Sequence, residues 1–471
     1  MSLIHAPQTV TRVSLNILVM AEISFICKRT VVSTKPVQPG KSYSLSVLDR
    51  SMETSHLRIV CYFQSLQHRE RGELTKTLRE SISVMLSCFP VVTGRLQKNF
   101  EGHWMIKCND AGVRMVEARV KGTVEEWLQR VDREKELKLV HWEDMYDKPY
   151  FWSTFYVQLT EFEEGGLAVG LSCSHLLADP VCATMFIKAW ADTNLAAKML
   201  SPPLFHPLPP RRPGNKNINH KPYIQLINYY KSSMEQKPVP VPASKCTTVT
   251  LAFAENMVQA CMAMARAGNA NDGSIPSPFE ALAGLFWVCL SKGKGMGEGL
   301  INMSVGLDMR NMLGLDKGFF GNCMIYNKVH GRKCPLDKEG LPEAAKAIGK
   351  VVSKMDTEGI MDLLEWMWEH DSNDQCAPSM SNHDLVCTNL ETIDPYSAMF
   401  EEGVAPLRVS YYIEPMCREG HVFILPSPGE GPLSRVVMVT LPEDEALRLC
   451  EDDFILHFSP TILMGVSRNN A

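Results

Sequence analysis

The chain of 471 residues lacks several features that mark particular classes of protein. No apolar run approaches the roughly 20 residues that a membrane-spanning helix needs, so we expect no integral membrane segment. There is no basic block and the net charge is −5, which argues against nucleic acid as a partner. The 15 cysteines stand singly without a Cys-x-x-Cys pair. This pattern argues against a metal site or a disulfide framework and favours a cytoplasmic protein.

The N-terminal residues 1–19 match the pattern of a signal peptide only weakly. Their apolar part is short, and Ser14 and Asn16 interrupt it. We expect a dispensable extension, since Met20 followed by Ala21 would make a suitable start.

Length and proline distribution predict two domains. A chain of 471 residues is too long for one ordinary core. Six prolines fall within 201–220, and more follow at 238–242. We therefore expect an N-terminal domain at 1–200, a proline-rich crossover at 201–245 and a C-terminal domain at 246–471.

Hydrophobic periodicity predicts an α/β protein with mixed sheets flanked by helices. Strand patterns and helix patterns occur in both halves of the chain. The expected strands include 56–63, 155–162, 167–173, 247–253, 300–307, 323–329, 383–388, 407–413, 421–425 and 434–441. The expected helices include 74–88, the segment after Thr123, 180–199, 254–266, 278–290, most of 341–368 and 442–451.

The stretch 169–180 carries the chemistry that we consider first. A buried strand pattern ends at His175, and a histidine held at the end of a rigid strand can serve as a general base. The alternative is a core histidine whose ring is satisfied by hydrogen bonds. Asp179 stands directly before Pro180, the arrangement of a helix N-cap followed by the first helical residue. We therefore expect Asp179 to brace the turn that carries His175 rather than to act as an acid.

Other arrangements that could support catalysis have weaker local contexts. A second His-x-x-x-Asp match, His370 to Asp374, lies in a polar, acidic stretch without a buried strand before it. No serine stands in a Gly-x-Ser-x-Gly elbow. Cys173 and Cys182 flank His175 in sequence, but neither strand alternation nor the helix pattern pairs them with it.

Several motifs, taken in order, resemble one family. They are Phe89-Pro90, Gly94-Arg95-Leu96, His175 to Asp179, the helix 278–287, Asp308-Met309-Arg310 and Phe320-Gly321-Asn322. Together they make the chain similar to the plant BAHD acyltransferases, which move acyl groups from coenzyme A thioesters to alcohols or amines. The resemblance covers nearly the whole chain.

This resemblance implies a specific architecture and reaction. Two similar chloramphenicol-acetyltransferase-like domains, joined by a long crossover, would enclose a tunnel with His175 at its middle. An acyl-CoA thioester, acting as co-substrate, and a small alcohol or amine acceptor would enter from opposite faces. His175 would take the acceptor's proton, and neither a metal nor another cofactor would be needed. The family also implies a monomer.

One family signature is eroded in this chain. The Asp-Phe-Gly-Trp-Gly motif should fall within 398–406, where both the aspartate and the tryptophan are missing. In the family, as the resemblance has it, the aspartate of that motif pairs with the arginine that Arg310 matches. We therefore expect Glu401 or Glu402 to take its place.

The eroded motif raises an alternative function. The family's eceriferum-type members, linked to cuticular wax, also lack this signature, and segments 108–117 and 123–128 resemble that branch. Such a protein would be a non-catalytic partner of a fatty-acid elongase at the endoplasmic reticulum surface. His175 and Asp179 are both intact, so the sequence leaves the two functions open.

Overall fold

The computed structural model describes residues 23–35, 40–64, 70, 72–209, 223–235, 245–267, 275–295, 299–371, 384–417, 419–429 and 431–466. The expected extension at 1–19 lies outside these ranges, as do 210–222 and 236–244 of the proline-rich crossover and Asp374 of the second His-x-x-x-Asp match. Among the described residues, no helix combines the length and the apolar character required to cross a membrane.

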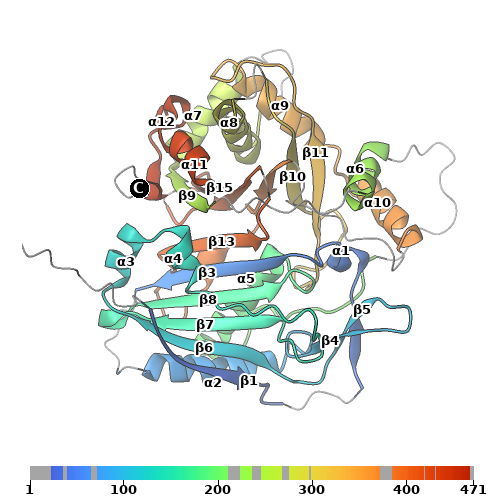
Figure 1. Cartoon of the computed structure of the whole chain (residues 1–471), viewed down its shortest axis with the longest axis vertical. Helices are drawn as coiled ribbons and strands as arrows, with labels where there is room; N and C mark the ends of the chain where they lie inside the picture. Colours follow the sequence, from blue (N-terminus) through green and yellow to red (C-terminus); the bar gives the residue numbers. More distant parts are fainter. Residues whose placement is uncertain are drawn as a thin grey trace, which may run out of the picture.

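A six-stranded sheet occupies the lower half of the molecule in Figure 1. Its strands lie in the order β1 (Ile23–Val31), β6 (Val113–Val120), β7 (Phe155–Glu161), β8 (Leu167–Ser174), β3 (His56–Phe63) and β13 (Arg408–Glu414). The β6–β7 pair is parallel and the other pairs are antiparallel. Strand β13, which comes from the range 246–471, therefore completes a sheet built otherwise from the first 200 residues.

A seven-stranded sheet forms the upper half. Its order is β11 (Met324–Val329), β10 (Met303–Asp308), β12 (Leu385–Asn389), β14 (His421–Pro426), β15 (Arg435–Pro442), β9 (Cys246–Phe253) and β16 (Thr461–Met464). Strand β12 runs parallel to both its neighbours. A smaller sheet joins β2 (Ser42–Ser44), β5 (Trp104–Lys107) and β4 (Arg95–Lys98).

Helices flank the sheets, so the mixed α/β fold predicted from periodicity is confirmed. In the first half they are α1 (Val47–Arg50), α2 (Glu73–Leu86), α3 (Val124–Arg130), α4 (Arg133–Leu137) and α5 (Pro180–Ala196). The rest of the described chain forms α6 (Ile224–Glu235), α7 (Glu255–Arg266), α8 (Pro278–Gly293), α9 (Leu341–Val352), α10 (Thr357–Glu369), α11 (Glu443–Cys450) and α12 (Asp453–Leu456).

Strand alternation explains how the core joins the two halves. In β3, Ile59 and Cys61 belong to the apolar cluster that contains α2 and α5, whereas Val60 and Tyr62 face the cluster that contains α3. In β14, Phe423 belongs to the same cluster as α2 and α5, while its neighbours pack with α8. The inner face of the second sheet therefore shares one apolar core with the first sheet.

A buried carboxylate holds β13 in the first sheet. Glu136 of α4 is fully buried, and its Oε1 accepts from Arg408 Nη2 at 2.8 Å and from the Ser410 hydroxyl at 3.1 Å. The hydroxyl of Tyr412 contacts the other oxygen. One face of β13 carries Arg408, Ser410 and Tyr412, because every second residue of a strand points to the same side. The carboxylate of Glu136 therefore holds this face against α4.

Gly170 allows β8 to lie close to the segment after α4. A Cβ built on Gly170 would stand 2.0 Å from the carbonyl oxygen of Leu139. We expect Gly170→Ala to lower the free energy of unfolding by about 1–3 kcal/mol, since the strand or that segment must move. Urea unfolding followed by tryptophan fluorescence measures this change. Gly293→Ala is the control, because nothing lies within 4 Å of the added methyl group; equal stability of the two variants would contradict the prediction.

Candidate active site

Strand β8 delivers His175 to the junction of the two halves. All eight residues of β8 are buried, and the strand lies between β7 and β3. At the end of the strand, the amide of Ser174 donates to Thr154 O and the amide of His175 donates to Ser55 O, each at 2.9 Å. The backbone at His175 is therefore fixed on both sides, and its side chain is only 1% exposed.

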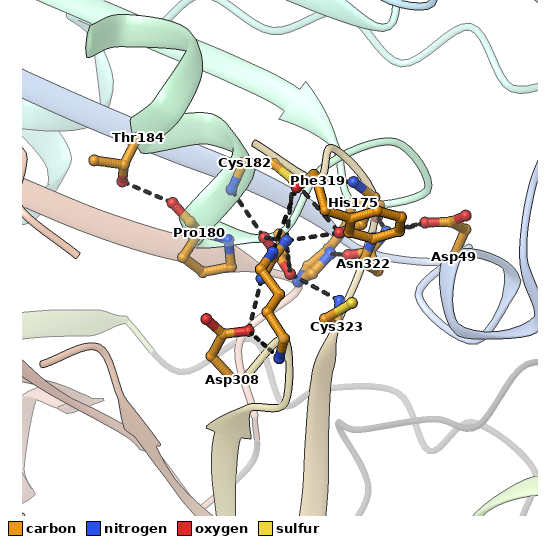
Figure 2. Close-up of polar contacts among 12 residues, drawn as sticks. Asp49, His175, Pro180, Cys182, Thr184, Asp308, Phe319, Asn322 and Cys323 are labelled. Carbon is orange, nitrogen blue, oxygen red and sulfur yellow. Dashed lines mark hydrogen bonds and ion pairs between the residues drawn. The ribbon is translucent and has the colours of Figure 1, made fainter. Parts of the chain in front are cut away.

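The tautomer of His175 follows from the bonds of Asn322, which lies between β10 and β11. The Asn322 amide nitrogen Nδ2 donates to Asp49 Oδ1 and to His175 O, both at 2.8 Å (Figure 2). Its Oδ1 therefore faces His175 Nδ1, 2.9 Å away. Because this oxygen can only accept, Nδ1 carries the proton. The other ring nitrogen, Nε2, consequently presents a lone pair.

Nε2 of His175 is buried and has no protein hydrogen-bond partner among the described residues. The His175 ring lines a cavity of about 20 Å³, which has room for about one water molecule. Its wall is largely apolar, with Met52, Val386 and Ile413 among its residues. A base in such a cavity is shielded from bulk solvent and can act on a group brought to it.

Burial also keeps His175 neutral. Loss of hydration lowers the pKa of His175 below its ordinary value of 6.5, and the nearby carboxylate of Asp179 and the bond to Asn322 only partly oppose this shift. A neutral imidazole with a free Nε2 is the form that can accept a proton near pH 7.

Asp179 caps α5, as its place before Pro180 predicts. Its Oδ1 accepts from the amide of Cys182 at 2.9 Å. The same fully buried carboxylate accepts from Arg310 Nη2 at 3.0 and 2.9 Å through its two oxygens, and from the amide of Cys323 at 2.9 Å. Asp179 thus ties the turn after His175 to the segment that carries Asn322.

The partner expected for Arg310 is corrected by these contacts. Arg310 pairs with Asp179 and with Asp308, whose Oδ1 lies 2.8 Å from Nη1, and not with Glu401 or Glu402 as the eroded motif suggested. The segment 398–406 packs elsewhere, because the ring of Phe400 contacts Trp190 late in α5. Eleven residues separate Trp190 from Asp179, about 16 Å along the helix.

Other groups that could react are engaged or suppressed. The thiol of Cys182 lies 3.1 Å from Arg310 Nη2 and 3.2 Å from the amide of Gly321. Burial raises the pKa of the Cys182, Cys173 and Cys323 thiols, so none of them is a ready nucleophile. Within the described ranges, no group of three or more histidine, cysteine or acidic side chains is placed to hold a metal ion.

The structure adds residues that sequence reasoning missed. Asp49 is buried beneath Asn322 and belongs to a capping box with Ser46 at the start of α1. The Ser-x-x-Asp spacing signals the cap but not the link to Asn322, which lies 273 residues away. His421 also lines the cavity of His175, and no local pattern in its strand distinguishes it.

Comparisons with known proteins agree with this architecture. The model of the Transferase family matches residues 21–455. Protein ECERIFERUM 26-like of Arabidopsis thaliana is 24% identical over 428 residues, covering 88% of this chain and 91% of that protein. Rosmarinate synthase of Plectranthus scutellarioides is 26% identical over 418 residues, covering 88% and 95%. The crystal structure of vinorine synthase superposes with a TM-score of 0.67 at 18% identity, covering 90% of this chain and 96% of that one.

The chain therefore belongs to the Transferase family, that of the BAHD acyltransferases. The family assignment from the ordered motifs is confirmed, together with the eceriferum resemblance. Membership of this family supports acyl transfer as the class of activity.

Proposed function

We propose that this protein transfers an acyl group from an acyl-CoA thioester to an alcohol or amine, with His175 as the general base. The observation that carries the proposal is the state of the His175 ring: Nδ1–H bound to Asn322, and an unpartnered Nε2 lone pair beside a cavity. Such an imidazole is set to accept one proton and to return it.

In the proposed reaction His175 takes a proton from the acceptor and later gives it to the leaving thiolate. Nε2 removes the proton of the acceptor hydroxyl or amine as that atom attacks the thioester carbonyl carbon. The carbonyl electrons move onto oxygen to give a tetrahedral oxyanion, which requires a hydrogen-bond donor. Collapse of the oxyanion breaks the carbon–sulfur bond, and Nε2–H protonates the departing thiolate. Asp179 and Arg310 act as positioning residues that hold the turn after His175.

Acceptor-dependent release of free coenzyme A thiol is the test. The wild-type protein is incubated with acyl-CoAs of short, aromatic and very long chains, each with and without panels of alcohols and amines. Thiol release that requires an acceptor, with matching ester or amide by mass spectrometry, supports transfer. Release without an acceptor is hydrolysis, and absence of release across the panels counts against the proposal.

The acid limb of the pH profile gives a further prediction. Protonated His175 cannot act as a base, so kcat/KM falls as pH drops through the pKa of His175. Since burial lowers this pKa, we expect a midpoint below 6.5 and a constant rate from about pH 7 to 8. Initial rates in constant-ionic-strength buffers measure the limb. A midpoint clearly above 6.5 would be inconsistent with a desolvated base.

A second function is favoured by the size of the cavity. About 20 Å³ beside His175 is far less than an acyl group with its thioester requires. Together with the eroded signature at 398–406 and the likeness to Protein ECERIFERUM 26-like, this supports a non-catalytic partner of a fatty-acid elongase. The test is elongation by reconstituted microsomes with and without the protein. Longer acyl products given equally by wild type and His175→Gln, without thiol release by the purified protein, would favour this second function.

A further inference from the structure

Two buried imidazoles line the cavity at the candidate active site. Besides His175, it is lined by His421, the first residue of β14, which reaches the site from the second sheet. Each ring has one buried nitrogen without a protein partner in the described ranges: Nε2 of His175 and Nδ1 of His421. A cavity that can hold about one water molecule thus has unsatisfied nitrogens on two of its rings.

The ring of His421 is held firmly in place. It is 3% exposed and stacks on Phe423 at a centroid separation of 4.0 Å. Its Nε2 lies 2.8 Å from the Thr388 hydroxyl oxygen. Burial lowers the pKa of His421 to about 3, so the ring is neutral and carries a single N–H. The position of this proton decides what His421 offers to the cavity.

The Thr388 hydroxyl bears on which nitrogen of His421 holds the proton. Its oxygen lies 2.8 Å from Nε2, and the hydroxyl can donate its hydrogen to that nitrogen. With that donor, the ring hydrogen of His421 is on Nδ1, and the two unpartnered nitrogens are complementary: Nε2 of His175 accepts and Nδ1 of His421 donates.

We propose that His421 is a second catalytic residue, whose Nδ1–H donates to the carbonyl oxygen of the bound thioester and to the oxyanion that replaces it. This inference rests on the proposed acyl transfer. As the acceptor loses its proton to His175 and bonds to the carbonyl carbon, negative charge gathers on the oxygen that His421 holds. When the carbon–sulfur bond breaks, the carbonyl re-forms and the proton passes from His175 to the thiolate. The apolar wall strengthens both hydrogen bonds.

Replacing His421 by asparagine and by glutamine distinguishes this catalytic role from a structural one. Asparagine at position 421 can place its amide nitrogen near the position of Nδ1, whereas glutamine reaches the position of Nε2. We expect His421→Phe, which keeps an aromatic ring on Phe423, to lower kcat roughly 10²- to 10³-fold with little change in KM. His421→Asn should recover at least tenfold of this loss and His421→Gln should not. Recovery by Gln rather than Asn, or equal rates in both, would show that only the contact with Thr388 matters and would overturn the proposal.

A measurement on the wild-type protein tests the proposal without requiring turnover. With ¹⁵N-labelled histidine, two-bond ¹H–¹⁵N spectra report which nitrogen of His421 is protonated, and His421→Phe assigns its signals. The probe is an acyl-CoA analogue in which a methylene group replaces the sulfur, so that the ketone binds but cannot be cleaved. An Nδ1–H tautomer whose signal shifts on binding supports the inference, and an Nε2–H tautomer or an unchanged signal refutes it. Absence of thiol release together with a shifted Nδ1–H signal would rule out acyl transfer as the function, but it would still establish the contact of His421 with the carbonyl.

Discussion

Replacing His175 by glutamine is expected to lower the turnover number of acceptor-dependent thiol release by roughly 10²- to 10⁴-fold, the usual contribution of a general base. Glutamine keeps similar length and polarity but has no basic nitrogen, so the acceptor must lose its proton to water. The KM for the acyl-CoA should change little, because the base acts on the acceptor. Stopped assays with a thiol reagent, extended over hours for the variant, measure both parameters.

His370→Gln is the matched control for this substitution. His370 begins the second His-x-x-x-Asp match in the chain, yet it lies exposed at the end of α10, with Nδ1 2.9 Å from Trp366 O. Its replacement should leave turnover unchanged. If His175→Gln retained wild-type rates while folded, the base assignment would be wrong, and the elongase-partner function would become the better account.

His175 illustrates what the sequence could predict. The apolar run 167–173 predicts a buried strand, and a histidine at the end of such a strand lies where the strand leaves the sheet. Asp179 before Pro180 predicts a capped helix, and α5 begins there. These features depend on residues close in the chain, whose spacing reflects the periods of strands and helices. The same reasoning located α2, α8 and six strands of the second sheet, but it did not predict β16.

Contacts distant in sequence could not be predicted in the same way. Arg310 pairs with Asp179 across 131 residues, and local spacing suggested Glu401 or Glu402 instead. Strand β13 lies in sequence between β12 and β14, two strands of the second sheet, but it pairs with β3 of the first sheet. In both cases the pairing partner is the one that satisfies a buried charge or an unpaired strand edge. These groups come together only when the two halves of the chain meet.

Arg310→Met should produce the largest loss of stability that we predict, about 3–5 kcal/mol in the free energy of unfolding. Methionine fills similar space but leaves the carboxylate of Asp179 buried at 0% exposure without its cation. Two backbone carbonyls, of Phe319 and Gly321, also lose the guanidinium as a donor. Urea unfolding followed by tryptophan fluorescence and circular dichroism measures the change, with both signals compared to test for a single transition.

The matched control is Arg448→Met, which breaks an exposed pair between Arg448 and Asp444 in α11. We expect a loss below about 0.5 kcal/mol there. Similar losses in the two variants would mean that burial does not govern the strength of the Arg310 pair.

Adding Asp179→Asn to Arg310→Met then separates charge pairing from packing. The double variant has no buried charge at position 179, while the amide oxygen can still cap α5, so it should be more stable than Arg310→Met alone. We expect a coupling energy of about 1–3 kcal/mol in the resulting double-mutant cycle. Strict additivity would show that Asp179 and Arg310 stabilise the protein independently. Coupling would show that the turn after His175 is held through the second half of the chain, so that formation of the catalytic geometry depends on docking of the two halves.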